Sequence, residues 1–180
     1  MDASHGVEPG TSSTTHERHS TPGVIEDGVL AGILGAVVVA VWFLILDTAQ
    51  GRIFFTPSLL GSVLSQGQDP DQVTSINTLI VFAYTGLHGV VFLIAGIWIA
   101  WMFMQFEKNP QFGTILLLLF VLFEAVLFSF EAALFPQLVG NMGSVTVASA
   151  NIFAAVAMFW FLLRRHPNAM LRLRDAWREE

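Results

Sequence analysis

The chain has 180 residues, of which 54% are hydrophobic and 12% are charged, with a formal net charge of −6 at pH 7. Soluble domains carry about 25% charged residues, so a protein of this composition is expected to fold in a lipid bilayer. The absence of cysteine excludes disulfides, cysteine-ligated iron–sulfur clusters, thioether-attached haem and a cysteine nucleophile within this chain.

The N-terminal tail, residues 1–23, contains His, Ser, Thr, Gly, Pro and Glu and almost no large apolar side chains. This composition cannot bury enough apolar surface to offset the entropy lost on ordering, so it predicts a disordered cytoplasmic tail. The tail also lacks the basic start and the early apolar stretch of a secretory signal. Its three histidines, His5, His16 and His19, are interpreted as solvated side chains rather than as a metal site.

Residues 24–166 predict an all-α integral membrane domain, a four-transmembrane-helix bundle. About 20 apolar residues cross a bilayer as a helix, and four segments qualify: about 27–46, 76–106, 112–135 and 144–163. With both termini in the cytoplasm, seven of the eight Lys and Arg residues lie on the cytoplasmic side and only Arg52 lies outside. Since Lys and Arg concentrate on the cytoplasmic side, we expect this orientation, in the bacterial inner membrane.

The segment between the first two spans, residues 47–74, predicts an interfacial helix on the outer membrane surface. Thr56 followed by Pro57 is typical of a helix N-cap and a first helical residue. A second cap pattern, Asp-Pro-Asp at 69–71, predicts that the next helix begins at Pro70, well outside the membrane. The apolar side chains of the interfacial helix recur at helical spacing: Leu59, Leu60, Val63 and Leu64.

The C-terminal segment, residues 167–180, predicts an amphipathic cytoplasmic helix. Its apolar side chains Met170, Leu173 and Trp177 share one helical stripe among arginines. This pattern suits a helix lying on anionic lipid. A docking surface for a cytoplasmic partner is the alternative interpretation.

Small residues indicate where the spans pack. Lipid tails give no hydrophobic drive for helix association, so close contact between helices needs small side chains. The predicted helix-packing seam consists of Gly28, Gly32, Ala36 and Ala40 in the first span, and of Ser144, Ala148, Asn151 and Ala155 in the fourth.

Two glutamates, Glu124 and Glu131, lie inside the third span, where an acidic residue at mid-helix costs about 2.5–3.5 kcal/mol. By depth, we expect Glu124 beside His88, and Glu131 beside Tyr84 or Asn151. These five residues form the predicted buried polar cluster. Since no Lys or Arg lies in the predicted hydrocarbon core, Glu124 is expected to be neutral or to share a proton with His88.

Four interpretations of this cluster remain open. It can be a hydrogen-bonded group that fixes helix register, a proton relay or quinone pocket, a metal site of the two glutamates with His88, or an axial haem or chlorin ligand at His88. A di-iron site is disfavoured because no span contains Glu-x-x-His. Gly86 and Gly89 would let a flat macrocycle approach His88, but a bis-histidine haem needs a second intramembrane histidine, and His166 lies at the cytoplasmic edge. We therefore assign neither a metal nor a cofactor.

The sequence contains no Walker loop, no Gly-x-Gly-x-x-Gly motif and no basic nucleic-acid surface, and no catalytic residues stand out. We expect a non-catalytic membrane subunit that packs in or scaffolds a larger membrane complex, with respiratory or photosynthetic assemblies as natural hosts. Its expected partners are the bilayer and other membrane subunits, not nucleic acid. The alternative is a small membrane redox or proton-transfer protein that uses the Glu/His/Tyr cluster and binds a quinone, haem or chlorin.

Overall fold

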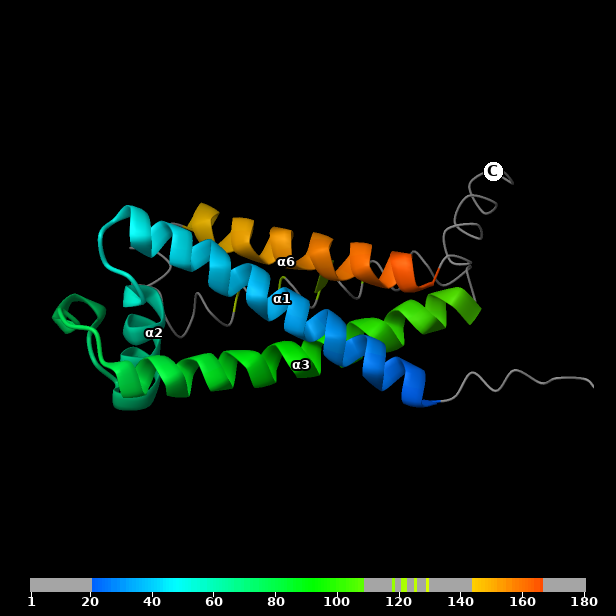
Figure 1. The fold of residues 1–180 in the computed structure, drawn as a ribbon, viewed down its shortest axis with the longest axis horizontal. Helices are drawn as coiled ribbons and strands as arrows, with labels where there is room; N and C mark the ends of the chain where they lie inside the picture. The colour runs from blue at the N-terminus through cyan, green and yellow to red at the C-terminus, as the bar shows by residue number, and fades with distance from the viewer. Residues whose placement is uncertain are drawn as a thin grey trace, which may run out of the picture.

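The computed structural model describes residues 21–108, 118, 121–122, 125, 129 and 144–166. Within these ranges the regular structure is helical throughout (Figure 1). The elements are α1 (Thr21–Ala49), α2 (Phe55–Gln66), the 3-10 turn η1 (Pro70–Gln72), α3 (Thr78–Lys108) and α6 (Ser144–Arg165). The all-α prediction is confirmed for this part of the chain.

Three of the helices are long and apolar enough to cross a membrane, over Gly23–Ala49, Thr78–Phe106 and Val145–Arg165. They match the first, second and fourth predicted spans to within four residues at each end. The chain is therefore a membrane protein. The third predicted span, both glutamates in it, and the two terminal segments lie outside the described residues, apart from five isolated helical positions in the third span and residues 21–23. Those three residues were predicted to belong to the disordered tail and instead form the start of α1.

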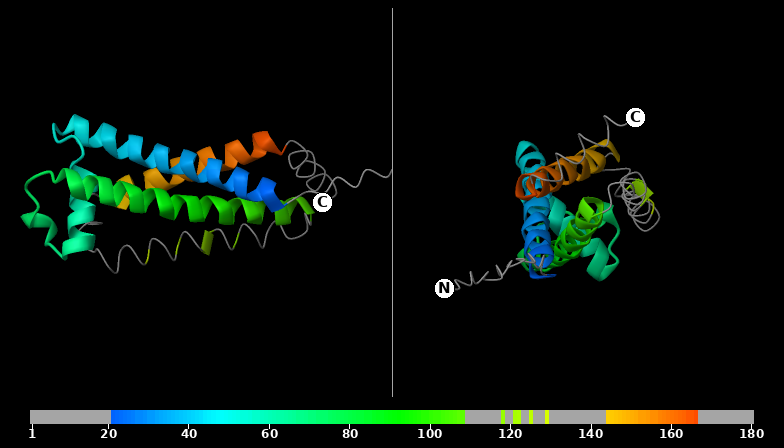
Figure 2. Two further views of the ribbon diagram at one scale, coloured as in Figure 1. Left: turned by 60° about the horizontal axis from the view of Figure 1, so that its bottom comes forward. Right: turned by 90° about the vertical axis from the view of Figure 1, so that its right-hand side faces the viewer.

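Helix α1 lies between the other two long helices and packs against both of them, whereas α3 and α6 touch each other much less. Both α3 and α6 run antiparallel to α1 (Figures 1 and 2). The bundle therefore has one end near Asp27 and another near Asp47, here named the Asp27 end and the Asp47 end. At the Asp47 end α2 lies across the bundle and packs mainly on α3.

Glycines bring the backbones of α1 and α3 into direct contact where the two helices cross. A Cβ added to Gly96 would lie 2.5 Å from the backbone nitrogen of Gly32 and would also collide with the carbonyl oxygen of Gly28. A Cβ on Gly32 would lie 2.9 Å from the Cα of Leu93. Only residues without a side chain permit this approach, which is how small residues replace the hydrophobic drive that lipid does not supply.

The remaining members of the predicted first-span stripe are less buried. Ala36 is half-buried and Ala40 is exposed. The two helices cross at an angle and separate toward the Asp47 end (Figure 1). A stripe at constant four-residue spacing therefore leaves the contact after about two turns. On α1 the next close approach is instead at Gly35, which packs against Met158 and Phe92.

On α6 the structure buries a different stripe from the predicted one. The buried residues are Ala150, Ala154, Met158 and Leu162, whereas Ala148, Asn151 and Ala155 are only half-buried. Ala150 and Ala154 pack against Val39, and Leu162 packs in a second cluster with Ala31. Alanines occur all around this helix, so their spacing alone does not select the face that meets α1.

The starts of α2 and α3 differ from the predicted caps. Helix α2 begins at Phe55, so Thr56 lies inside its first turn and the N-cap residue is Phe54. Asp69 caps only the short turn η1, and α3 begins at Thr78 rather than at residue 70. The α3 cap is Asn77, whose side-chain oxygen accepts from the backbone N–H groups of residues 79 and 80.

Candidate functional site

Tyr84, His88 and Phe92 place their rings in a row on one face of α3. The rings of Tyr84 and His88 stack with centroids 6.2 Å apart, and those of His88 and Phe92 are 4.6 Å apart. Residues four apart share a helix face, which is why the sequence could place Tyr84 and His88 together. Two of the five predicted cluster residues are therefore neighbours in the structure.

His88 connects α3 to α1. Its Nε2 lies 3.2 Å from the carbonyl oxygen of Ala36. A carbonyl oxygen can only accept, so Nε2 carries the proton and donates this hydrogen bond. Gly86 and Gly89 have open space where a Cβ would be, but the His88 ring is directed to α1 through Nε2. Axial ligation by Nε2 would require the imidazole to leave Ala36.

The predicted contacts of the two glutamates cannot be placed, because Glu124 and Glu131 lie outside the described residues. Asn151 is half-buried on α6, next to the alanines that pack on α1. Within the described ranges no group of three or more His, Asp or Glu side chains is positioned to hold a metal ion.

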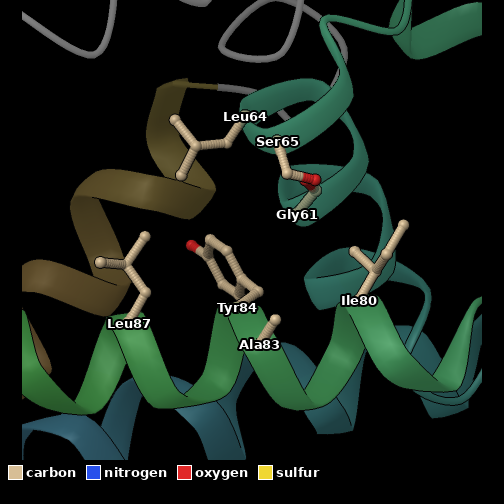
Figure 3. A pocket seen from close by; sticks show the side chains of 7 residues that line it. All are labelled: Gly61, Leu64, Ser65, Ile80, Ala83, Tyr84 and Leu87. Carbon is tan, nitrogen blue, oxygen red and sulfur yellow. The ribbon is translucent and has the colours of Figure 1, made fainter.

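A small cavity of about 100 Å³ lies between α2 and α3, beside Tyr84. Figure 3 shows the Tyr84 hydroxyl directed between Leu64 of α2 and Leu87 of α3. A cavity of about 150 Å³ is known to hold a benzene ring, so this one suits a chain end or water rather than a ring. Its lining residues are Gly61, Leu64, Ser65, Ile80, Ala83, Tyr84 and Leu87.

An ionic cluster joins α1 to α6 at the Asp27 end. Asp27 accepts from Arg165 Nε at 2.8 Å through Oδ1, and its Oδ2 lies 3.0 Å from His166 Nε2. Arg165 also reaches Glu26, with Nη2 3.2 Å from Oε1. The Asp27 side chain is only 12% exposed, while that of Glu26 is 69% exposed, so Asp27 is the residue that the cluster surrounds.

A second buried acid joins α1 to α2 at the Asp47 end. Asp47 Oδ2 accepts from the backbone N–H of Thr56 at 2.8 Å, and Oδ1 accepts from the Thr56 hydroxyl at 2.6 Å. Both residues are buried. A carboxylate at the start of α2 accepts a hydrogen bond from an amide that has no partner inside the helix. Its negative charge also interacts favourably with the positive end of the α2 dipole. The Asp47 side chain therefore serves as the cap that the N-cap residue Phe54 does not provide.

A third polar contact joins α1 to α6 near the Asp47 end. Trp42 Nε1 donates to the carbonyl oxygen of Thr146 at 3.3 Å, and the Trp42 ring meets Phe153 edge-on at 5.0 Å.

Sequence reasoning did not identify Asp27, Asp47 or Trp42. The available signal was that an acid closes each end of the first apolar stretch, with Arg165 and His166 at the matching boundary of the fourth span.

Comparison of the chain with protein-family models, with curated proteins and with solved structures finds no match.

Proposed function

We propose that the chain is a non-enzymatic integral membrane subunit that packs in or scaffolds a larger membrane complex. It is a four-span bundle of the bacterial inner membrane, with both termini cytoplasmic, α2 on the outer surface and an amphipathic C-terminal helix. The host is an energy-transducing complex, respiratory or photosynthetic. One observation carries the non-enzymatic part: the side chains of Asp27, Asp47 and His88 each bind another element of this chain.

The energetic argument concerns what buried polar groups do. Burying an acid costs folding free energy unless the acid is paired, so a buried acid is expected to serve a purpose that offsets this cost. Asp27 binds α6, Asp47 binds α2, and His88 binds α1. Each contact fixes how two elements lie relative to each other. Rigid relative positions are what a scaffold has to supply.

The outward surfaces support contact with other subunits. On α3, Leu79 is 77% exposed and Phe82 is 72% exposed, and on α6, Val145 is 77% exposed. These faces suit lipid or an apolar helix. Beside Phe82, Gly86 is exposed and has open space at its Cβ position, which permits another helix to approach closely.

Site-specific photo-crosslinking in native membranes tests this proposal. A benzophenone side chain at Phe82 or at Trp160 reports on exposed faces, and one at buried Phe103 is the control. We expect discrete crosslinks to other membrane polypeptides at the exposed positions only, and the same polypeptides in a mild-detergent purification. A lone monomer that gives only lipid adducts would exclude the subunit role.

The second candidate is a small membrane redox or proton-transfer protein. The stacked rings of Tyr84 and His88 favour it, since both residue types can carry protons. The ligand would be a quinone, haem or chlorin. The absorbance spectrum and metal content of the purified chain distinguish the two candidates. A Soret or chlorin band that disappears in His88→Ala would support the redox protein.

A further inference from the structure

The turn between α1 and α2 exposes two large apolar side chains next to each other. Ile53 and Phe54 are each 50% exposed. They follow Arg52, which is also exposed and whose guanidinium lies 4.0 Å from the centre of the Phe55 ring. The turn therefore presents a cation and an apolar pair on adjacent residues.

Backbone and side-chain hydrogen bonds hold this turn in one shape. Phe54 has a φ of 65°, a left-handed conformation that bulky residues rarely adopt. The Arg52 amide donates to the carbonyl oxygen of Asp47 at 2.8 Å, and the Phe55 amide donates to that of Arg52 at 3.0 Å. The Asp47 carboxylate holds Thr56 on the other side of Phe54. The exposed position of Phe54 is thus fixed by hydrogen bonds on both sides.

The same contacts set the depth of the turn relative to the membrane. Asp47 directly follows the apolar stretch of α1 and so marks where the hydrocarbon layer ends. Because the chain folds back and Thr56 binds the Asp47 side chain, Ile53 and Phe54 are held near the level of Asp47 rather than far out in water. Trp and Tyr concentrate at this boundary in membrane proteins, and Phe and Leu enter it from the apolar faces of interfacial helices.

We propose that Arg52, Ile53 and Phe54 form a bilayer-interface anchor, in which the two apolar side chains enter the headgroup layer and the guanidinium binds lipid phosphate. Arginine pairs with phosphate through charge-assisted hydrogen bonds, and the exposed Arg52 guanidinium also donates to the Gln50 side chain at 2.7 Å. The anchor fixes the height of α2 on the membrane. It is independent of whether the chain is a complex subunit or a redox protein.

Spin labelling of single-cysteine variants tests the anchor, because the natural chain contains no cysteine. The full-length protein is reconstituted in phosphatidylcholine vesicles with and without phosphatidylglycerol, with a nitroxide at Phe54→Cys or Ile53→Cys. Collisions with oxygen, which enters lipid, are compared with collisions with a nickel chelate supplied on both sides. References are Ile45→Cys on the exposed face of α1 and Gln68→Cys in the exposed turn after α2.

We expect oxygen-to-nickel collision ratios at 53 and 54 that lie between those at 45 and 68. Ile53→Cys leaves Phe54, the residue with the left-handed backbone, unchanged. The label at 53 therefore tests the anchor even if Phe54→Cys fails to fold. A ratio equal to that at 68, or shielding from both reagents as a protein partner would cause, would overturn the anchor. Adding Arg52→Gln should shift the ratio at 53 toward that at 68 in anionic vesicles, and an unchanged ratio would overturn the phosphate contact.

Discussion

Gly96→Ala tests the central packing feature, the backbone contact between α1 and α3. The new methyl group would lie 2.5 Å from the backbone nitrogen of Gly32 and 2.6 Å from its Cα. Backbone atoms cannot rotate away as a side chain can. Restoring an ordinary van der Waals distance requires the helices to part by about 1 Å. That separation loses about a quarter to a half of the attractive energy of each dispersion contact along the crossing.

The magnitude follows from two opposing effects. Overpacking of this kind costs about 1–3 kcal/mol, while replacing Gly by Ala in a helix interior gains about 0.5–1 kcal/mol. Gly86→Ala is the matched control, because it lies in the same helix and nothing lies within 4 Å of its Cβ position. Both variants share the propensity gain. The difference in unfolding free energy between them is therefore the steric cost, about 1–3 kcal/mol.

Unfolding of the full chain from mild-detergent micelles by added dodecyl sulfate, followed by circular dichroism, measures this difference. We expect Gly96→Ala to unfold at a lower dodecyl sulfate fraction than the natural chain, and Gly86→Ala at an equal or higher one. Equal unfolding free energies for the two variants would show that the backbones of α1 and α3 are not in contact in the folded protein, and the reasoning would fail.

Three further predictions use the same unfolding measurement. Asp27→Asn should lower the unfolding free energy because it removes the charge that Arg165 pairs with, while Glu26→Gln, at an exposed side chain, should change it little. Equal losses of unfolding free energy in the two variants would contradict the central position of Asp27. Asp47→Ala should cost about 2 kcal/mol, because it leaves a buried amide and a buried hydroxyl without a partner, and an unchanged stability would show that Asp47 does not cap α2. Phe54→Gly in detergent should raise the unfolding free energy by about 1 kcal/mol, because glycine adopts the left-handed conformation without strain; a large loss would mean that the ring packs on protein instead.

The features that the sequence predicted are those that a single segment determines. The spans at 76–106 and 144–163 follow from long apolar runs, and the structure has helices there to within two residues at each end. The places of Gly28 and Gly32 also follow from one segment, because only residues without a side chain let a neighbouring backbone approach. The stacked pair Tyr84 and His88 follows from their spacing of four.

The features that the sequence did not predict depend on a second segment. Ala150 and Ala154, rather than Ala148 and Ala155, are buried because they pack against α1. No pattern within α6 indicates which of its faces meets α1. The start of α2 at Phe55 depends on Asp47, nine residues earlier in the chain, because the local cap signal at Thr56 is overridden by a carboxylate that reaches in from the preceding helix.

The positions of the buried acids explain how an apolar helix acquires specific neighbours at low cost. The interior of α1 between Asp27 and Asp47 carries no charged side chain, so inside the bilayer its contacts are made by glycine, alanine, valine and aromatic side chains. The two buried acids of α1 lie near its ends, where water and headgroups reduce the desolvation penalty that an ion pair would meet at mid-membrane. There each charge selects one partner: Asp27 selects the end of α6, and Asp47 selects the start of α2. The apolar interior therefore supplies close packing, and the terminal acids decide which element lies beside which.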